Sequence, residues 1–142
     1  MKNEKELFLL RNEDIQNATQ KEYRQYFCGN LKRPQILDFI YMDNLEIGTS
    51  RYATFTTDEP HYHQTTSDMI YILKGEFHIL LLEDKKQITL KPGDFISIPA
   101  KTSYASKAKA GTETLFVKKC HGNDKVKVTI SEETKIWLSV EI

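Results

Sequence analysis

Two histidines separated by one residue are the part of this sequence best suited to chemistry. His61 and His63 flank Tyr62, and side chains alternate between the two faces of an extended segment. The two imidazoles therefore point the same way, and Tyr62 points the other way. Two neutral imidazoles that converge from one strand supply half of a metal site. The alternative is that both histidines belong to a polar loop that follows Asp-Glu-Pro at positions 58–60.

A carboxylate and two glycines follow the histidines at regular spacing. Starting from His61, the sequence reads HxH(x)4D(x)6G, with Asp68 as the acidic residue, and from Gly93 it reads G(x)5P. These two patterns, in this order, resemble the two motifs of the cupin superfamily. The first family motif has two His, a Glu and a Gly, and the second has a Gly, a Pro and a downstream His. The resemblance covers residues 60 to about 106 and implies a β-barrel with a ligand pocket in its interior.

This chain differs from the family at two ligand positions. Asp68 stands where the first motif usually has Glu, and its shorter side chain must come closer to form the same bond. Counted from Pro99, the second-motif His falls on Tyr104, and a Gly of that motif is Lys101 here. A phenol with a pKa of about 10 binds a metal well only as phenolate. Tyr104 is therefore either a fourth ligand, a hydrogen-bonding group for a substrate, or an aromatic that fills the barrel mouth.

The resemblance implies a role for each candidate residue. His61, His63 and Asp68 would bind a divalent ion such as Fe, Mn, Ni or Zn. His63 and Tyr104 are the predicted catalytic residues, and Tyr104 and Lys101 the predicted substrate-binding residues. Asp68 could instead be a turn or capping residue. The lysines after Pro99 could either steer an anionic substrate or lie on solvated surface; they are Lys101, Lys107 and Lys109.

Three functions remain open from these residues. The first is a metal-binding cupin enzyme that isomerises, epimerises or oxygenates a small polar molecule, such as a sugar or small organic acid. The second is a non-catalytic binding protein whose site has lost its chemistry through the Asp68 and Tyr104 differences. The third is a metal-free sugar-nucleotide isomerase or epimerase, in which His63 or His61 acts as general base and Tyr104 as acid.

The segments that carry and surround these residues are predicted to be β-strands. From Gln35 onward, short apolar or alternating runs are separated by turn residues, which is typical of antiparallel strands. The predicted fold is all-β, a double-stranded β-helix or jelly-roll barrel with a short N-terminal helical or irregular segment. The predicted strands are 36–42, 45–56, 69–73, 77–82, 87–90, 95–98, 112–119, 126–130 and 135–140, with one helix within 12–27. We expect one domain over 1–142, with an N-terminal extension 1–34 and the barrel from about 35 to 142.

Composition excludes several classes of partner. The 142 residues contain 20 basic and 20 acidic side chains, so no overall field attracts nucleic acid or an anionic membrane. The longest apolar run is far shorter than a bilayer span, and the first residues lack the features of a signal peptide, so we expect a cytoplasmic protein. Cys28 and Cys120 are the only cysteines. We expect both to be free, reduced thiols without a catalytic role.

The strand expected at 77–82 also bears on assembly. It is apolar at nearly every position, which indicates that both of its faces are covered. One face should fill the barrel, and the other carries His78, Leu80 and Leu82, with His78 expected to be a buried structural histidine. We therefore predict a homodimer in which a second subunit covers this outer face.

Overall fold

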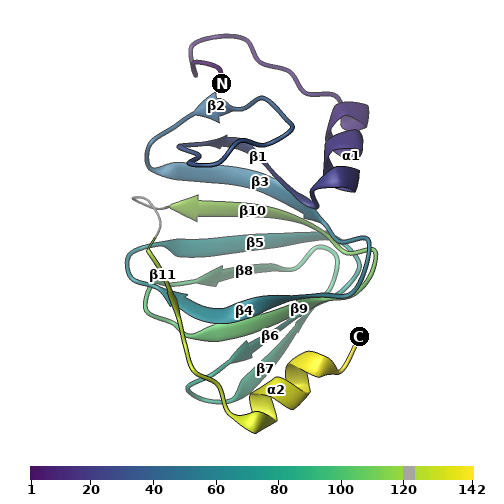
Figure 1. Ribbon diagram of the computed structural model, residues 1–142, viewed down its shortest axis with the longest axis vertical. Helices are drawn as coiled ribbons and strands as arrows, with labels where there is room; N and C mark the ends of the chain where they lie inside the picture. The colour runs from purple at the N-terminus through teal and green to yellow at the C-terminus, as the bar shows by residue number, and fades with distance from the viewer. Residues whose placement is uncertain (120–123) are drawn as a thin grey trace.

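The computed structural model describes residues 1–119 and 124–142. The described residues form two β-sheets and two short helices (Figure 1). The elements in chain order are α1 (Asn12–Lys21), β1 (Arg24–Gly29), β2 (Ile40–Tyr41), β3 (Leu45–Arg51), β4 (Thr56–His63), β5 (Ser67–Lys74), β6 (Phe77–Leu81), β7 (Lys86–Leu90), β8 (Phe95–Ile98), β9 (Tyr104–Ala108), β10 (Glu113–Lys119), β11 (Lys125–Lys127) and α2 (Glu132–Ser139). None of these helices is long and apolar enough to cross a membrane.

The two sheets pack face to face around one apolar core. One sheet has the order β2-β1-β3-β10-β5-β8, and the other has the order β11-β4-β9-β6-β7. Ile72 on β5 and Ile79 on β6 are fully buried between them, and truncating either to Ala would cost about 2–5 kcal/mol. The prediction of an all-β jelly-roll fold is confirmed.

Gly75, the last residue of the first sequence pattern, occupies a position where a side chain would collide with Thr112. Gly75 lies in the turn between β5 and β6 with φ +86°, a conformation that residues with a Cβ avoid. A Cβ built there would lie 2.4 Å from Thr112 Oγ1 and 2.5 Å from Thr112 Cα. The turn from β5 in one sheet to β6 in the other therefore packs directly against Thr112.

The N-terminal segment contains the helix expected within 12–27 and, after it, a strand that was not predicted. Helix α1 ends at Lys21, and β1 begins at Arg24 and pairs antiparallel with β3. The aromatic residues Tyr26 and Phe27 favour a strand here more than a helix. A segment expected to precede the barrel therefore contributes a strand to one of its sheets.

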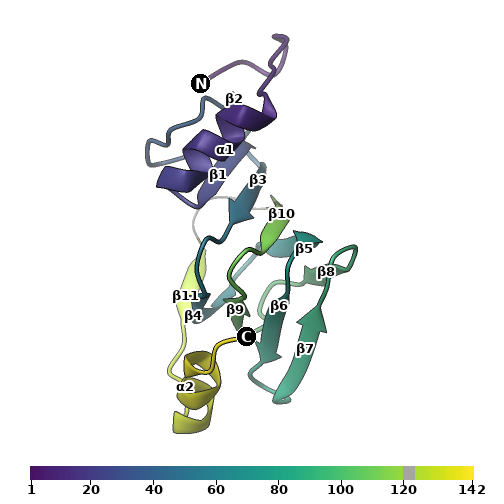
Figure 2. The ribbon, with the colours of Figure 1, turned by 90° about the vertical axis from the view of Figure 1, so that its right-hand side faces the viewer.

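The C-terminal segment is helical, so the strand predicted at 135–140 is wrong. Ser131 Oγ accepts a hydrogen bond from the Thr134 N–H at 3.2 Å, and acidic residues occupy the first turn of α2. Both features stabilise a helix N-terminus, and the short apolar run of the helix resembled a strand. Figure 2 shows α2 on the side of β9 that faces away from β5 and β8.

The outer face of β6 is partly covered within the chain. Leu80 is 7% exposed and pairs with Ala105 on β9. Farther along the same face of β9, Lys107 donates from Nζ to the carbonyls of Trp137 at 2.7 Å and Val140 at 2.9 Å, which fixes α2 against the sheet. The burial of Leu80 therefore does not require a second subunit, and the homodimer stays a prediction.

Candidate metal centre and its cavity

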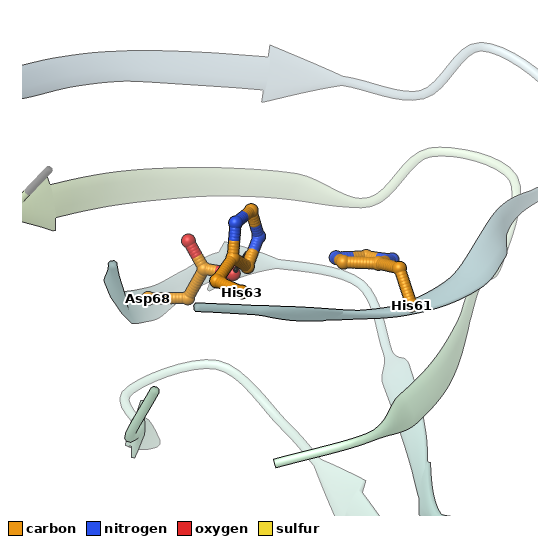
Figure 3. Close-up of side chains that lie close together, drawn as sticks. All are labelled: His61, His63 and Asp68. Atoms are coloured by element: carbon orange, nitrogen blue, oxygen red, sulfur yellow. Dashed lines mark ion pairs between the residues drawn. The ribbon is translucent and has the colours of Figure 1, made fainter. Parts of the chain in front are cut away.

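Three candidate ligands lie together between the two sheets. His61 and His63 are on β4, and Asp68 is near the start of β5, after a short connection. Figure 3 shows both imidazoles on the same side of β4, with the Asp68 carboxylate next to His63. One potential ligand atom from each residue lies within 4.8 Å of the other two. The three residues predicted as metal ligands therefore lie together.

His61 presents Nε2 as a free lone pair. The side chain is 3% exposed, and its Nδ1 lies 2.5 Å from the Glu59 carbonyl oxygen. A carbonyl only accepts, so Nδ1 carries the proton and donates it. Burial lowers the pKa of His61, which keeps the imidazole neutral. A neutral imidazole with a fixed tautomer is the form that binds a metal ion.

His63 is held between two carboxylates. Its Nδ1 lies 2.9 Å from Asp124 Oδ1, and its Nε2 lies 3.1 Å from Asp68 Oδ2. Burial lowers the pKa of His63, but hydrogen bonds and charges from Asp68 and Asp124 outweigh burial and raise it above its usual value. The proton on Nε2 would have to leave before that nitrogen could bind a metal ion.

Asp68 has one oxygen occupied and one without a partner. Oδ2 accepts from the Tyr104 hydroxyl at 2.7 Å and faces His63, whereas Oδ1 is buried and has no hydrogen-bond partner among the described residues. Burial raises the pKa of Asp68, but His63, Lys118 and Tyr104 outweigh it and lower the pKa. An ionised, buried oxygen without a donor is unfavourable.

A divalent cation fits this donor set. Ligand atoms bonded to one ion at about 2.0–2.2 Å lie up to roughly 4 Å apart, so small side-chain adjustments would bring the three atoms to bonding distance. The unpartnered Asp68 Oδ1 would then gain a positive partner. Two imidazoles and a carboxylate suit Fe(II), Mn(II), Ni(II) or Zn(II).

Tyr104 completes the cluster as a hydrogen-bond donor. It is 5% exposed on β9 and pairs with His61 across the sheet, and its ring centroid lies 4.7 Å from that of His61. Burial raises the pKa of Tyr104 well above its usual value, and the Asp68 carboxylate raises it further. The phenol therefore keeps its proton and donates it to Asp68.

Asp124 is a functional residue that the sequence prediction missed. Besides His63, its carboxylate accepts from the backbone N–H groups of Thr65 and Thr66, both at 2.7 Å, and from the hydroxyls of the same threonines. Burial raises the pKa of Asp124, but these donors outweigh it and lower the pKa strongly. Asp124 thus ties the connection between β4 and β5 to His63 and fixes the ring. No motif marked it, because it lies 56 residues after Asp68 in an ordinary turn sequence.

A cavity of about 70 Å³ opens beside the cluster. Its lining includes the two histidines, Asp68 and Tyr104, together with aromatic and basic side chains from both sheets. Lys101 does not line it: that residue lies exposed beside Tyr62 in a separate surface hollow. The structure thus brings together four of the five predicted site residues and leaves Lys101 apart, so its contact with substrate stays a prediction.

Three other predicted features lie outside the cavity. Lys107 contacts α2 through its buried ammonium group and does not face a barrel mouth. His78 is half-buried and its Nε2 lies 2.6 Å from Glu76 Oε2. Cys28 is a buried free thiol, as predicted, whereas Cys120 lies outside the described residues. None of the three described side chains takes part in the cluster.

The chain is thus a small two-sheet β-barrel in which two His and one carboxylate side chain come together from strands of different sheets. Residues 49–118 match the family described as "Cupin domain". This match supports the cupin superfamily for the chain, and the solved structures below share its fold.

Solved structures with the same fold are distant in sequence. KdgF from Halomonas sp. has 17% identity and a TM-score of 0.54, with 71% of this chain and 79% of that chain covered. The polyketide cyclase RemF from Streptomyces resistomycificus has 20% identity and a TM-score of 0.55, with 70% of both chains covered. An RmlC-like cupin from Shewanella frigidimarina has 20% identity and a TM-score of 0.53, with 71% and 78% covered. No curated protein matches the sequence.

Proposed function

We propose that this protein is a small cupin that binds one divalent metal ion through His61, His63 and Asp68 and a small polar ligand in the adjacent cavity. The observation that carries this proposal is the buried Asp68 Oδ1, which has no partner among the described residues. It lies in the same cluster as two imidazoles. A cation is the partner that this arrangement lacks.

The proposed chemistry follows from the donor set. A bound divalent ion would supply Lewis acidity toward a ligand oxygen, or a site for dioxygen. Tyr104 would hold Asp68 in place and keep a proton beside the cavity, and Asp124 would fix the tautomer of His63. Isomerisation, epimerisation or oxygenation of a sugar or small organic acid are the reaction classes we propose. RemF, described as a polyketide cyclase, is a solved example of the same fold in an enzyme.

A second function is favoured by the hydrogen-bond chain around His63. Tyr104, Asp68, His63 and Asp124 are connected in that order by contacts of 2.7, 3.1 and 2.9 Å. A histidine oriented by a carboxylate next to a protonated phenol is also a suitable acid-base pair without metal. In this alternative His63 is the general base and Tyr104 the acid of a metal-free isomerase or epimerase. A non-catalytic binding role would use the same cavity.

Metal titration separates these proposals. We would strip the protein of metal and titrate it with Zn²⁺ and Ni²⁺ by calorimetry, using wild type, the double variant His61→Ala and His63→Ala, and Tyr104→His. His78→Ala serves as a matched control, because His78 lies outside the cluster. One ion per chain bound by wild type and His78→Ala, and lost in the double variant, supports the metal site. Absence of binding by both wild type and Tyr104→His would end the metal proposal and leave the acid-base or binding alternative.

We also propose that the protein is a cytoplasmic homodimer. The exposed apolar side chains near the β5-β8 edge are available for an interface: Tyr71, Leu73 and Phe95. A monomeric mass by light scattering at tens of micromolar would contradict the dimer.

A further inference from the structure

The cavity is lined by a half-buried arginine from outside the family motifs. Arg24 belongs to β1, which precedes the family match at 49–118, and its side chain lines the same cavity as the His61, His63 and Asp68 cluster. Residue 24 reaches this position because β1 pairs with β3, where Arg24 is opposite Ser50. The N-terminal segment therefore adds a fixed positive charge to the interior of the barrel.

The guanidinium group is oriented by one hydrogen bond and two aromatic rings, and Asp58 is the carboxylate whose charge acts on it. Its Nε–H donates to Ser50 Oγ at 3.1 Å, and its central carbon lies 5.4 Å from the Tyr23 ring and 5.6 Å from the Phe116 ring. None of the ion pairs among the described residues includes Arg24. A guanidinium stays charged at any pH that the protein tolerates, so Arg24 keeps a positive charge beside the cavity.

The two acidic side chains that line the cavity each have a closer partner than Arg24. Asp58 lies 3.5 Å from Lys125, and the Asp68 carboxylate is turned toward His63 and Tyr104. Among the described lining residues, three basic side chains, Arg24, Lys118 and Lys125, face two acidic ones. Among these described lining residues, the Lys and Arg side chains thus outnumber the Asp side chains by one.

We propose that Arg24 binds the carboxylate of a small organic acid in this cavity. This inference rests on the proposed function and narrows its ligand from polar molecules in general to carboxylates. The planar guanidinium offers two parallel N–H donors that match the two oxygens of a carboxylate. A cavity of about 70 Å³, room for roughly five water molecules, suits a compact acid. Because Arg24 and the metal cluster line one cavity, such an acid would bring its other polar groups next to His61, His63 and Asp68.

Titration of the metal-stripped protein with small acids tests whether Arg24 binds a carboxylate. The probes are acetate and lactate, their neutral amides acetamide and lactamide, and inorganic phosphate, followed by calorimetry and by amide chemical shifts. We expect the acids to bind at least about ten times more tightly than the amides, and Arg24→Gln to weaken acid binding roughly ten- to hundredfold. Arg33→Gln is the matched control, because Arg33 is exposed, and it should bind acids like wild type.

Arg24→Lys keeps the positive charge but removes the pair of parallel N–H donors, so it tests whether carboxylate binding needs that pair. It also provides the test of Arg24 if Arg24→Gln does not fold. We expect Arg24→Lys to bind acids more weakly than wild type does, because one ammonium cannot form two parallel hydrogen bonds to a carboxylate. Equal binding by wild type and Arg24→Lys, equal binding of acids and amides, or binding of phosphate but of neither acid would overturn the proposal. Zn²⁺ titration of the same samples separates carboxylate binding by Arg24 from the proposed metal site. Metal binding without acid binding refutes only the role of Arg24. Arg24-dependent acid binding without metal binding refutes only the metal site.

Discussion

The position of Asp124 allows a sharp test of how His63 is prepared for metal binding. Asp124 Oδ2 accepts from the backbone N–H groups of Thr65 and Thr66, whereas Oδ1 faces His63 Nδ1 and the Thr66 hydroxyl. In Asp124→Asn, the amide oxygen must stay toward the two backbone donors. The amide NH2 then faces His63 and donates to Nδ1.

This isosteric change should reverse the tautomer of His63. In the wild type, the neutral ring keeps its one proton on Nδ1, where Asp124 accepts it. With Nδ1 accepting in the variant, the proton of the neutral ring stays on Nε2, the nitrogen 3.1 Å from Asp68 Oδ2, and no lone pair is left there for a metal ion. Loss of one carboxylate that orients a ligand histidine weakens metal affinity by about 10- to 100-fold. We expect a loss in this range or above it for Zn²⁺, together with about 1–3 kcal/mol of lost stability because charge-assisted hydrogen bonds become neutral ones.

The assay combines Zn²⁺ calorimetry with urea unfolding, so that metal affinity and stability are measured on the same sample. Asp84→Asn is the matched control, because Asp84 is exposed in the turn between β6 and β7, and it should change neither quantity. If Asp124→Asn folds and binds Zn²⁺ as tightly as wild type, His63 does not bind the ion through Nε2 and the reasoning fails.

Three further predictions concern other parts of the molecule. Tyr104→His should raise Zn²⁺ affinity by about tenfold, because a neutral imidazole coordinates at pH 7 without losing a proton; calorimetry that shows unchanged or weaker binding would contradict this. Lys107→Met removes the hydrogen bonds to α2 and the contact with the Trp137 ring, so urea unfolding should show about 2 kcal/mol lower stability and the fluorescence of the single tryptophan should report loosening of α2. The exposed Lys109→Met should do neither. Replacing Cys28 and Cys120 by Ser should leave Zn²⁺ and acetate binding unchanged, and loss of either with the fold intact would show a role for a thiol.

The sequence predicted the parts of this protein that local rules determine. Alternation along a strand was sufficient to place His61 and His63 on one face, and the spacing of Asp68 and Gly75 set the next strand and its turn. The same local rules failed at the C-terminus, where Ile136, Trp137 and Leu138 form an apolar run short enough to suit either a strand or a helix. The Ser131 cap and the acidic first turn favour the helix.

The residues missing from the sequence prediction are those whose roles depend on contacts between distant segments. Arg24 reaches the cavity only because β1 joins the sheet next to β3, and Asp124 reaches His63 only because the segment before β11 returns to β4. Both lie outside the family match at 49–118, so the family motif supplies the candidate metal ligands and the flanking segments supply the charge and orientation around them. We therefore expect the affinity for a ligand specific to this protein to depend more on Arg24 and Asp124 than on the motif residues. Transplanting residues 49–118 into another barrel of the same fold should transfer the metal ligands but not the preference for a carboxylate, and transfer of both would show that the flanking segments do not select the ligand.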